Sequence, residues 1–213
     1  ESEQPPHVTL LVDESRSMGL GDPPRFDAIR RLAAALAYTA LSREGHVGLM
    51  AFADEAAELP PRSGRGAIED VIDFLRSRTP HGATGLDRAA QQLVHGPAVI
   101  LTDGFETDDI DAAVRRLRYA RFDVLLVQVL NSDELDPPRR RLVTLRAAES
   151  PRRLRLTQNG AVRRRYLEAL GRHRERLGAL CAGHGAAFAS VAASDDPCDA
   201  VLGLFRRGML SEV

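Results

Sequence analysis

The sequence predicts an α/β fold in which a mostly parallel sheet is covered by helices on both faces. Short, continuous apolar runs alternate along the chain with segments whose apolar residues recur at three- and four-residue steps. The first pattern is typical of strands buried on both faces, and the second is typical of amphipathic helices. Their alternation favours parallel strands joined by helical crossovers.

The expected elements follow one another regularly as far as residue 130. Apolar runs predict strands at 8–12, 47–52, 98–102 and 122–130, and a shorter strand at 56–59 that Pro60 and Pro61 end. Helical periodicity predicts helices at 26–43, 67–76, 86–94 and 109–119. The sequence Asp22-Pro23-Pro24 leads into the first helix, and Gly45 is expected to close it.

The pattern changes after residue 130. Residues 131–141 are polar, and alternating segments at 142–145 and 154–157 flank a Ser150-Pro151 turn, which predicts a small β-hairpin insert near 142–157. A long helix at 161–182, a strand at 187–192 and a helix at 198–209 complete the chain. We expect residues 1–213 to form a single domain with an elaboration at about 131–182.

Composition excludes several functions. All 29 basic residues are arginine, and the absence of lysine excludes a Walker-type phosphate loop and Schiff-base chemistry. The net charge of −1 argues against nucleic acid as a partner. The net charge is the sum of an acidic first part and a basic second part. Residues 1–137 contain 14 arginines and 23 acidic residues, and residues 138–213 contain 15 arginines and 7 acidic residues.

The expected location is cytoplasmic. No apolar run approaches the roughly 20 residues of a membrane-spanning helix, and Cys181 and Cys198 have no metal-binding spacing. Because the chain starts at Glu1, we expect a fragment of a longer protein, whose N-terminal part could anchor it in a membrane.

Polar side chains follow two of the buried strands. Asp13 ends the strand at 8–12, and Asp103 ends the strand at 98–102. Ser15 and Ser17 alternate with Asp13, so in an extended segment all three side chains point the same way. Thr84 lies in a glycine-rich loop ahead of a helix. The carboxyl ends of parallel strands meet at one sheet edge, and an all-oxygen group there suits Mg²⁺ or Mn²⁺ better than zinc.

The pattern Asp13-x-Ser15-x-Ser17, followed by Thr84 and Asp103, resembles the metal-ion-dependent adhesion site (MIDAS) of a von Willebrand factor type A (vWA) domain. The resemblance implies a Rossmann-like three-layer vWA fold. The resemblance extends to one particular bacterial family of unknown function, whose vWA module is typically encoded beside MoxR-type AAA+ ATPases. The segments that resemble this family are residues 11–19, 31–38 and 47–52.

The resemblance implies a non-enzymatic, metal-dependent protein-interaction module. Ser15, Ser17 and Thr84 would bind Mg²⁺ or Mn²⁺ through their hydroxyls, and Asp13 and Asp103 mostly through waters. The open coordination position would take an Asp or Glu carboxylate of a protein ligand, with a MoxR-type AAA+ ATPase as the expected partner in chaperone-like assembly or maturation. The residues expected at the partner-binding rim are Met18, Gly82, Gly104 and Glu106.

Two alternatives remain open at this stage. A Mg²⁺-dependent hydrolase or phosphotransferase can use a similar sheet, but it would need a second aspartate near the first and a later lysine, where this chain has Ser15 and no lysine. The arginine-rich segment 139–176 is a docking surface for an acidic partner, a binding surface for RNA or phospholipid, or a solvated helix face. Few aromatic residues interleave its arginines, which argues further against nucleic acid.

Overall fold

A computed structural model describes residues 7–64, 66–94, 96–137 and 160–210, with two further strands at 143–146 and 153–156. Six strands form one sheet in the order β3-β2-β1-β4-β5-β8. Only β3 is antiparallel to its neighbour, which confirms the predicted mostly parallel sheet. The strands are β1 (His7–Asp13), β2 (His46–Phe52), β3 (Ala56–Arg62), β4 (Ala98–Thr102), β5 (Val124–Leu130) and β8 (Ala187–Ala192).

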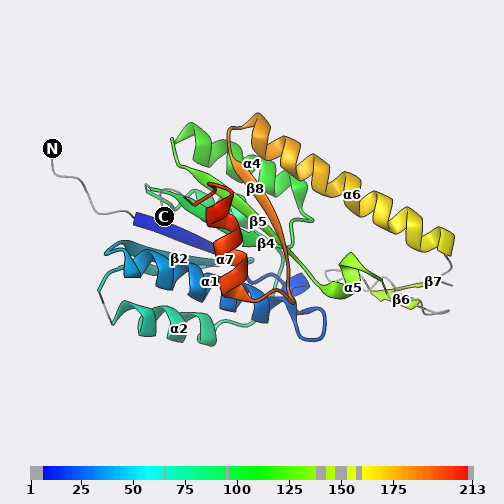
Figure 1. Ribbon diagram of the computed structural model, residues 1–213, viewed down its shortest axis with the longest axis horizontal. Coiled ribbons are helices and arrows are strands. Elements are labelled where there is room, and N and C mark those ends of the chain that lie inside the picture. The colour runs from blue at the N-terminus through cyan, green and yellow to red at the C-terminus, as the bar shows by residue number, and fades with distance from the viewer. Residues whose placement is uncertain are drawn as a thin grey trace.

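Helices cover both faces of the sheet, as Figure 1 shows. One face carries α1 (Arg25–Ser42), α2 (Ala67–Ser77) and α7 (Pro197–Arg206), and the other carries α3 (Leu86–Ala90), α4 (Thr107–Tyr119) and α6 (Gly160–Gly183). Because side chains alternate along a strand, Leu10 and Val12 of β1 belong to the first core and Leu11 to the second. The molecule therefore has the predicted three layers.

The edge strand β3 is longer than predicted. It continues through Pro60 and Pro61 to Arg62, whereas the sequence pattern ended it at residue 59. Proline lacks the N–H that a central strand would need, but β3 lies at the edge of the described sheet. Its pairing with β2 also shifts register between Leu59 and Arg62, so neither Pro60 nor Pro61 is paired with a residue of β2. The two prolines also make this edge a poor template for pairing with another chain.

Three local expectations need correction. The left-handed residue after α1 is Glu44, with φ of 62°, and Gly45 instead donates its N–H to the carbonyl of Ala40. Helix α3 ends at Ala90 rather than at residue 94, so it has little more than one turn. Two short helices were not predicted: η1 (Arg16–Gly19), which is a 3₁₀ turn, and α5 (Ser132–Leu135).

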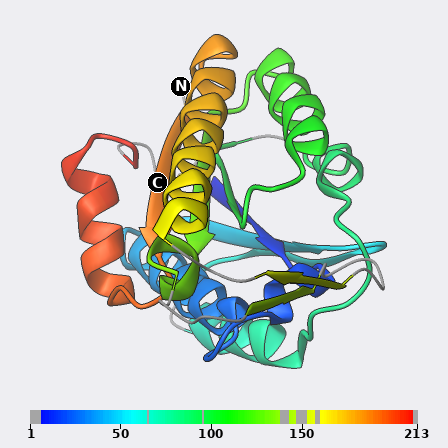
Figure 2. The same ribbon diagram turned by 90° about the vertical axis from the view of Figure 1, so that its right-hand side faces the viewer.

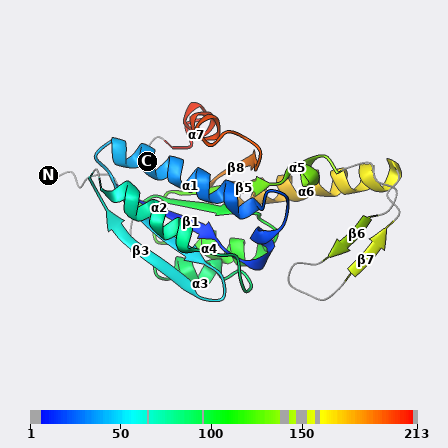
Figure 3. The same cartoon turned by 90° about the horizontal axis from the view of Figure 1, so that it is seen from below.

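The predicted hairpin insert is present. Strands β6 (Val143–Arg146) and β7 (Arg153–Leu156) pair antiparallel, and the predicted Ser150-Pro151 turn lies outside the described residues. The hairpin and the N-terminal half of α6 extend beyond the end of the sheet at which β5 leads into α5 (Figures 1 and 3). Figure 2 views the molecule from this end, with α6 and the hairpin toward the reader. Among the helices that the structure describes, none has the length and apolarity needed to cross a membrane.

Candidate functional site

The carboxyl ends of β1 and β4 are neighbours at the centre of the sheet. The two strands pair in parallel with Val12 opposite Leu101, so Asp13 lies beside Thr102. Helix α1 follows β1 on one face and α4 follows β4 on the other, and such a divergence of crossovers leaves a crevice between the strand ends. An open pocket of about 330 Å³ lies there.

Asp13 is buried, with 1% of its surface exposed. Its Oδ2 accepts a hydrogen bond from Thr102 Oγ1 at 2.6 Å, and its Oδ1 accepts one from the Ser15 N–H at 2.9 Å. Burial, reinforced by the nearby charge of Asp103, raises the pKa of Asp13 from 3.8 to about 7, although the hydrogen bonds from Ser15 and Thr102 oppose this rise. A negative charge on Asp13 is therefore costly in the protein alone.

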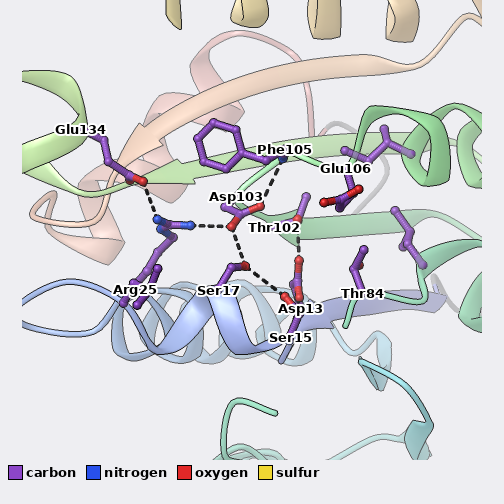
Figure 4. A pocket seen from close by; sticks show the side chains of 13 residues that line it. Asp13, Ser15, Ser17, Arg25, Thr84, Thr102, Asp103, Phe105, Glu106 and Glu134 are labelled. Atoms are coloured by element: carbon purple, nitrogen blue, oxygen red, sulfur yellow. Dashed lines mark hydrogen bonds and ion pairs between the residues drawn. The ribbon is translucent and has the colours of Figure 1, made fainter. Parts of the chain in front are cut away.

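The two serines connect Asp13 to Asp103, as Figure 4 shows. Ser15 Oγ lies 3.1 Å from Ser17 Oγ, and Ser17 Oγ donates to Asp103 Oδ2 at 2.7 Å. Four of the five candidate ligands thus form one hydrogen-bonded cluster. A serine hydroxyl that donates its proton keeps lone pairs with which to bind a cation, so these bonds are compatible with metal binding.

Thr84 faces the same pocket from the loop ahead of α3 (Figure 4). Two hydrogen bonds hold this loop against its surroundings: the Arg16 N–H donates to the Gly82 carbonyl at 3.1 Å, and the Ala83 N–H donates to Asp54 Oδ1 at 3.0 Å. The first bond joins the Thr84 loop directly to the segment that carries Ser15 and Ser17. All five candidate ligands therefore lie around one pocket.

Arg25 is a buried site residue that the sequence analysis missed. Its Nη1 donates to Asp103 Oδ2 and its Nη2 to Glu134 Oε1, both at 2.6 Å, and only 2% of its surface is exposed. The signal was available, because Arg25 lies at helical spacing from Ile29 and Leu36 on the buried face of α1. The arginine fixes Asp103 and connects the site to α5.

The loop after β4 is held by residues of β5 and α6. Gln128 Nε2 donates to the Asp103 carbonyl at 2.9 Å, and His173 Nε2 donates to the Gly104 carbonyl at 2.9 Å. The His173 ring also stacks on Phe105, with 5.3 Å between the ring centroids. His173 is thus a partly buried, hydrogen-bonded residue, and it positions the loop that carries Asp103.

The four residues expected at the rim differ in their exposure to solvent. Glu106 is exposed and lines the pocket, and Gly82 is half-buried in the Thr84 loop. Met18 is 0% exposed, because the 3₁₀ turn of η1 directs its side chain into the core. Gly104 is also buried. Met18 and Gly104 are therefore buried rather than exposed at the rim, and the partner-binding role of these four residues stays a prediction.

The donor set fits a hard divalent cation. Three hydroxyls and two carboxylates offer only oxygen, the ligand that Mg²⁺ and Mn²⁺ prefer. Arg25 compensates the charge of Asp103, whereas Asp13 makes no ion pair with a basic side chain among the described residues. The described residues contain no group of three or more His, Cys, Asp or Glu that could hold a metal. A cation held here would consequently depend on the hydroxyls.

The fold resembles that of vWA domains. An aerotolerance-related membrane protein from Bacteroides fragilis has a TM-score of 0.60 and 18% identity, over 94% of this chain and 97% of that chain. The hypothetical protein BatB from Bacteroides thetaiotaomicron has a TM-score of 0.59 and 16% identity, over 95% and 98%. The VWA domain of SpRpn10 has a TM-score of 0.51 and 12% identity, over 93% and 94%.

The sequence itself identifies the family. The model of the family "Protein of unknown function DUF58" matches residues 1–176, and the chain belongs to this family. No curated protein has a significantly similar sequence. At the identities given above, the structural likenesses establish the fold alone.

Proposed function

We propose that this chain is a non-catalytic, divalent-metal-dependent protein-interaction module. The observation that carries the proposal is the convergence of five oxygen-bearing side chains in one open pocket at the carboxyl edge of the sheet, namely Asp13, Ser15, Ser17, Thr84 and Asp103. Mg²⁺ or Mn²⁺ at this position would supply an electrophilic centre for an Asp or Glu carboxylate of a partner, because neutral hydroxyls leave most of its charge uncompensated.

Each residue has a distinct role in the proposal. Ser15, Ser17 and Thr84 would bind the ion through their hydroxyls, while Asp13 and Asp103 would act mostly through waters. Arg25 is a positioning residue, since its ion pair with Asp103 at 2.6 Å fixes the orientation of that carboxylate. The hydrogen bonds that already join Ser15, Ser17 and Asp103 preorganise the site.

The hydrolase alternative lacks support from the site. A phosphoryl-transfer enzyme needs a cationic side chain that is free to bind the transferred group. The guanidinium of Arg25 is the basic group that lines the pocket, and it is paired with both Asp103 and Glu134. The binding function is therefore the one we propose.

The partner that we propose is a MoxR-type AAA+ ATPase, in chaperone-like assembly or maturation. Membership of the DUF58 family supports it, together with the sequence resemblance to modules encoded beside such ATPases. The module would act on the cytoplasmic side. A similar structure is described as an aerotolerance-related membrane protein, which supports membrane anchoring of the parent protein.

A pull-down with a MoxR-type AAA+ ATPase tests this function. We expect the ATPase to bind in Mg²⁺ and to be lost in EDTA or in the variant Thr84→Ala. The matched control is Thr79→Ala, since Thr79 is exposed and does not line the pocket. Retention of the ATPase in EDTA and on Thr84→Ala would refute the metal-dependent contact.

A further inference from the structure

Two exposed apolar side chains border the candidate metal site. Leu20 is 44% exposed and Phe105 is 43% exposed, and both line the pocket that contains the five oxygen-bearing residues. Leu20 directly follows η1, which carries Ser17, and Phe105 lies two residues after Asp103. The two short segments that carry Ser17 and Asp103 therefore also carry these two apolar side chains.

The pocket is larger than a metal site alone requires. Its volume is about 330 Å³, and two buried apolar side chains, Leu86 and Ile110, also line it. A water molecule takes up about 30 Å³ of liquid, so a hydrated cation and one carboxylate leave part of the pocket free. The pocket has the size and the mixed lining of sites that hold small ligands or single side chains.

Phe105 is fixed in position. Its ring stacks on His173, and its N–H donates to Asp103 Oδ1 at 3.2 Å. A rigid aromatic side chain loses little conformational freedom when a ligand covers it, so most of the gain from burying apolar surface contributes to affinity. The contact with Asp103 also sets the distance between the apolar surface and the oxygen cluster.

Charge at the rim narrows the class of ligand. Glu106 is exposed and lines the same pocket, so its carboxylate repels a second acidic residue that enters beside the first. An apolar neighbour meets no such repulsion and covers Leu20 and Phe105. The pocket therefore favours one carboxylate next to a bulky apolar group over an acidic cluster.

We propose that the partner segment presents an aspartate or glutamate beside a bulky apolar residue such as leucine or phenylalanine. This inference rests on the proposed metal-dependent function, in which the carboxylate faces the oxygen cluster. The apolar side chain packs against Leu20 and Phe105. The two contacts together give specificity, because the carboxylate alone does not distinguish one acidic segment from another.

Short labelled peptides test this inference by fluorescence anisotropy in Mg²⁺. Two peptides have a central aspartate with phenylalanine directly before it or directly after it. The reference peptide has serine on both sides of the aspartate. We expect the better phenylalanine peptide to bind about tenfold more tightly than the serine peptide, from the apolar area that the contact buries. In Phe105→Ser and Leu20→Ser this ratio should fall toward one.

The matched control is Leu202→Ser, because Leu202 is 50% exposed on α7 and does not line the pocket. Its ratio should equal that of the unsubstituted protein. Since each ratio compares two peptides on the same variant, any weakening of metal binding cancels.

The outcomes separate the two proposals. A ratio near one in the unsubstituted protein, or a tenfold ratio that survives in both Phe105→Ser and Leu20→Ser, overturns the apolar contact and leaves metal-dependent binding intact. Equal binding of the aspartate peptide and its asparagine counterpart, or equal binding in EDTA, overturns the metal-dependent function and this inference with it.

Discussion

Asp13 provides the sharpest prediction, because the buried carboxylate should destabilise the metal-free protein. Replacing it in Asp13→Asn removes the charge and keeps the size. The amide oxygen can still accept the Ser15 N–H, and the amide NH₂ can donate to the hydroxyl of Thr102. We therefore expect the variant to be more stable than the unsubstituted protein at alkaline pH in EDTA.

The magnitude follows from the pKa. A rise from 3.8 to about 7 corresponds to about 4 kcal/mol at most, since each pH unit is worth about 1.4 kcal/mol. Below about pH 4 the carboxyl of Asp13 is protonated in both states and costs nothing. Between about pH 4 and 7 it is ionised only in the unfolded chain, so stability falls as the pH rises. Above about pH 7 the full cost is present.

Urea denaturation in EDTA at pH 5 and pH 8 measures this effect. The stability of Asp13→Asn relative to the unsubstituted protein should increase by about 2–3 kcal/mol between the two pH values. Adding Mg²⁺ should raise the midpoint of the unsubstituted protein only, because a ligand stabilises the state that binds it. A stability difference that is the same at both pH values would refute the reasoning.

Three further predictions concern stability and thiol reactivity. A thiol reagent should label exposed Cys198 at once and Cys181 only after unfolding, because burial raises the pKa of Cys181 to about 11. Arg25→Met should cost about 3–5 kcal/mol in urea denaturation, since it leaves buried Asp103 without its ion pair. Gly85→Ala should lower the free energy of unfolding by about 1–3 kcal/mol, because the added Cβ would lie 2.4 Å from the Ala53 carbonyl oxygen. The comparison variant Gly171→Ala, whose Cβ would lie in open space within α6, should raise it by about 0.5–1 kcal/mol. Equal labelling of both thiols, or equal effects of the two glycine variants, would contradict these accounts.

The central sheet was predictable because its strands are defined by what they bury. Continuous apolar runs such as 98–102 match β4 to the residue, since a strand covered on both faces has no polar side to blur its ends. The same logic placed Asp13 and Asp103 together, because parallel neighbours end at one edge. Their common location followed from topology rather than from local sequence.

What the sequence analysis missed depends on distant partners. Arg25 lies at helical spacing from buried residues of α1, but its partners Asp103 and Glu134 lie 78 and 109 residues away, where local sequence does not show them. Pro60 ends a strand by local rules but is tolerated in β3 because this strand lies at the edge of the sheet. Met18 was expected at the partner-binding rim, but the turn of η1 buries its side chain in the core.

Calorimetric titration of Mn²⁺ tests the central claim most directly, with Ser17→Ala against the matched control Ser42→Ala. Ser17 lines the pocket and donates to Asp103, whereas Ser42 lies at the exposed end of α1. We predict that one ion binds per chain in the unsubstituted protein and in Ser42→Ala. Ser17→Ala should bind the ion at least about tenfold more weakly, because it has lost roughly one direct ligand. Absence of binding to the unsubstituted protein, or equal affinity in all three proteins, would contradict the account.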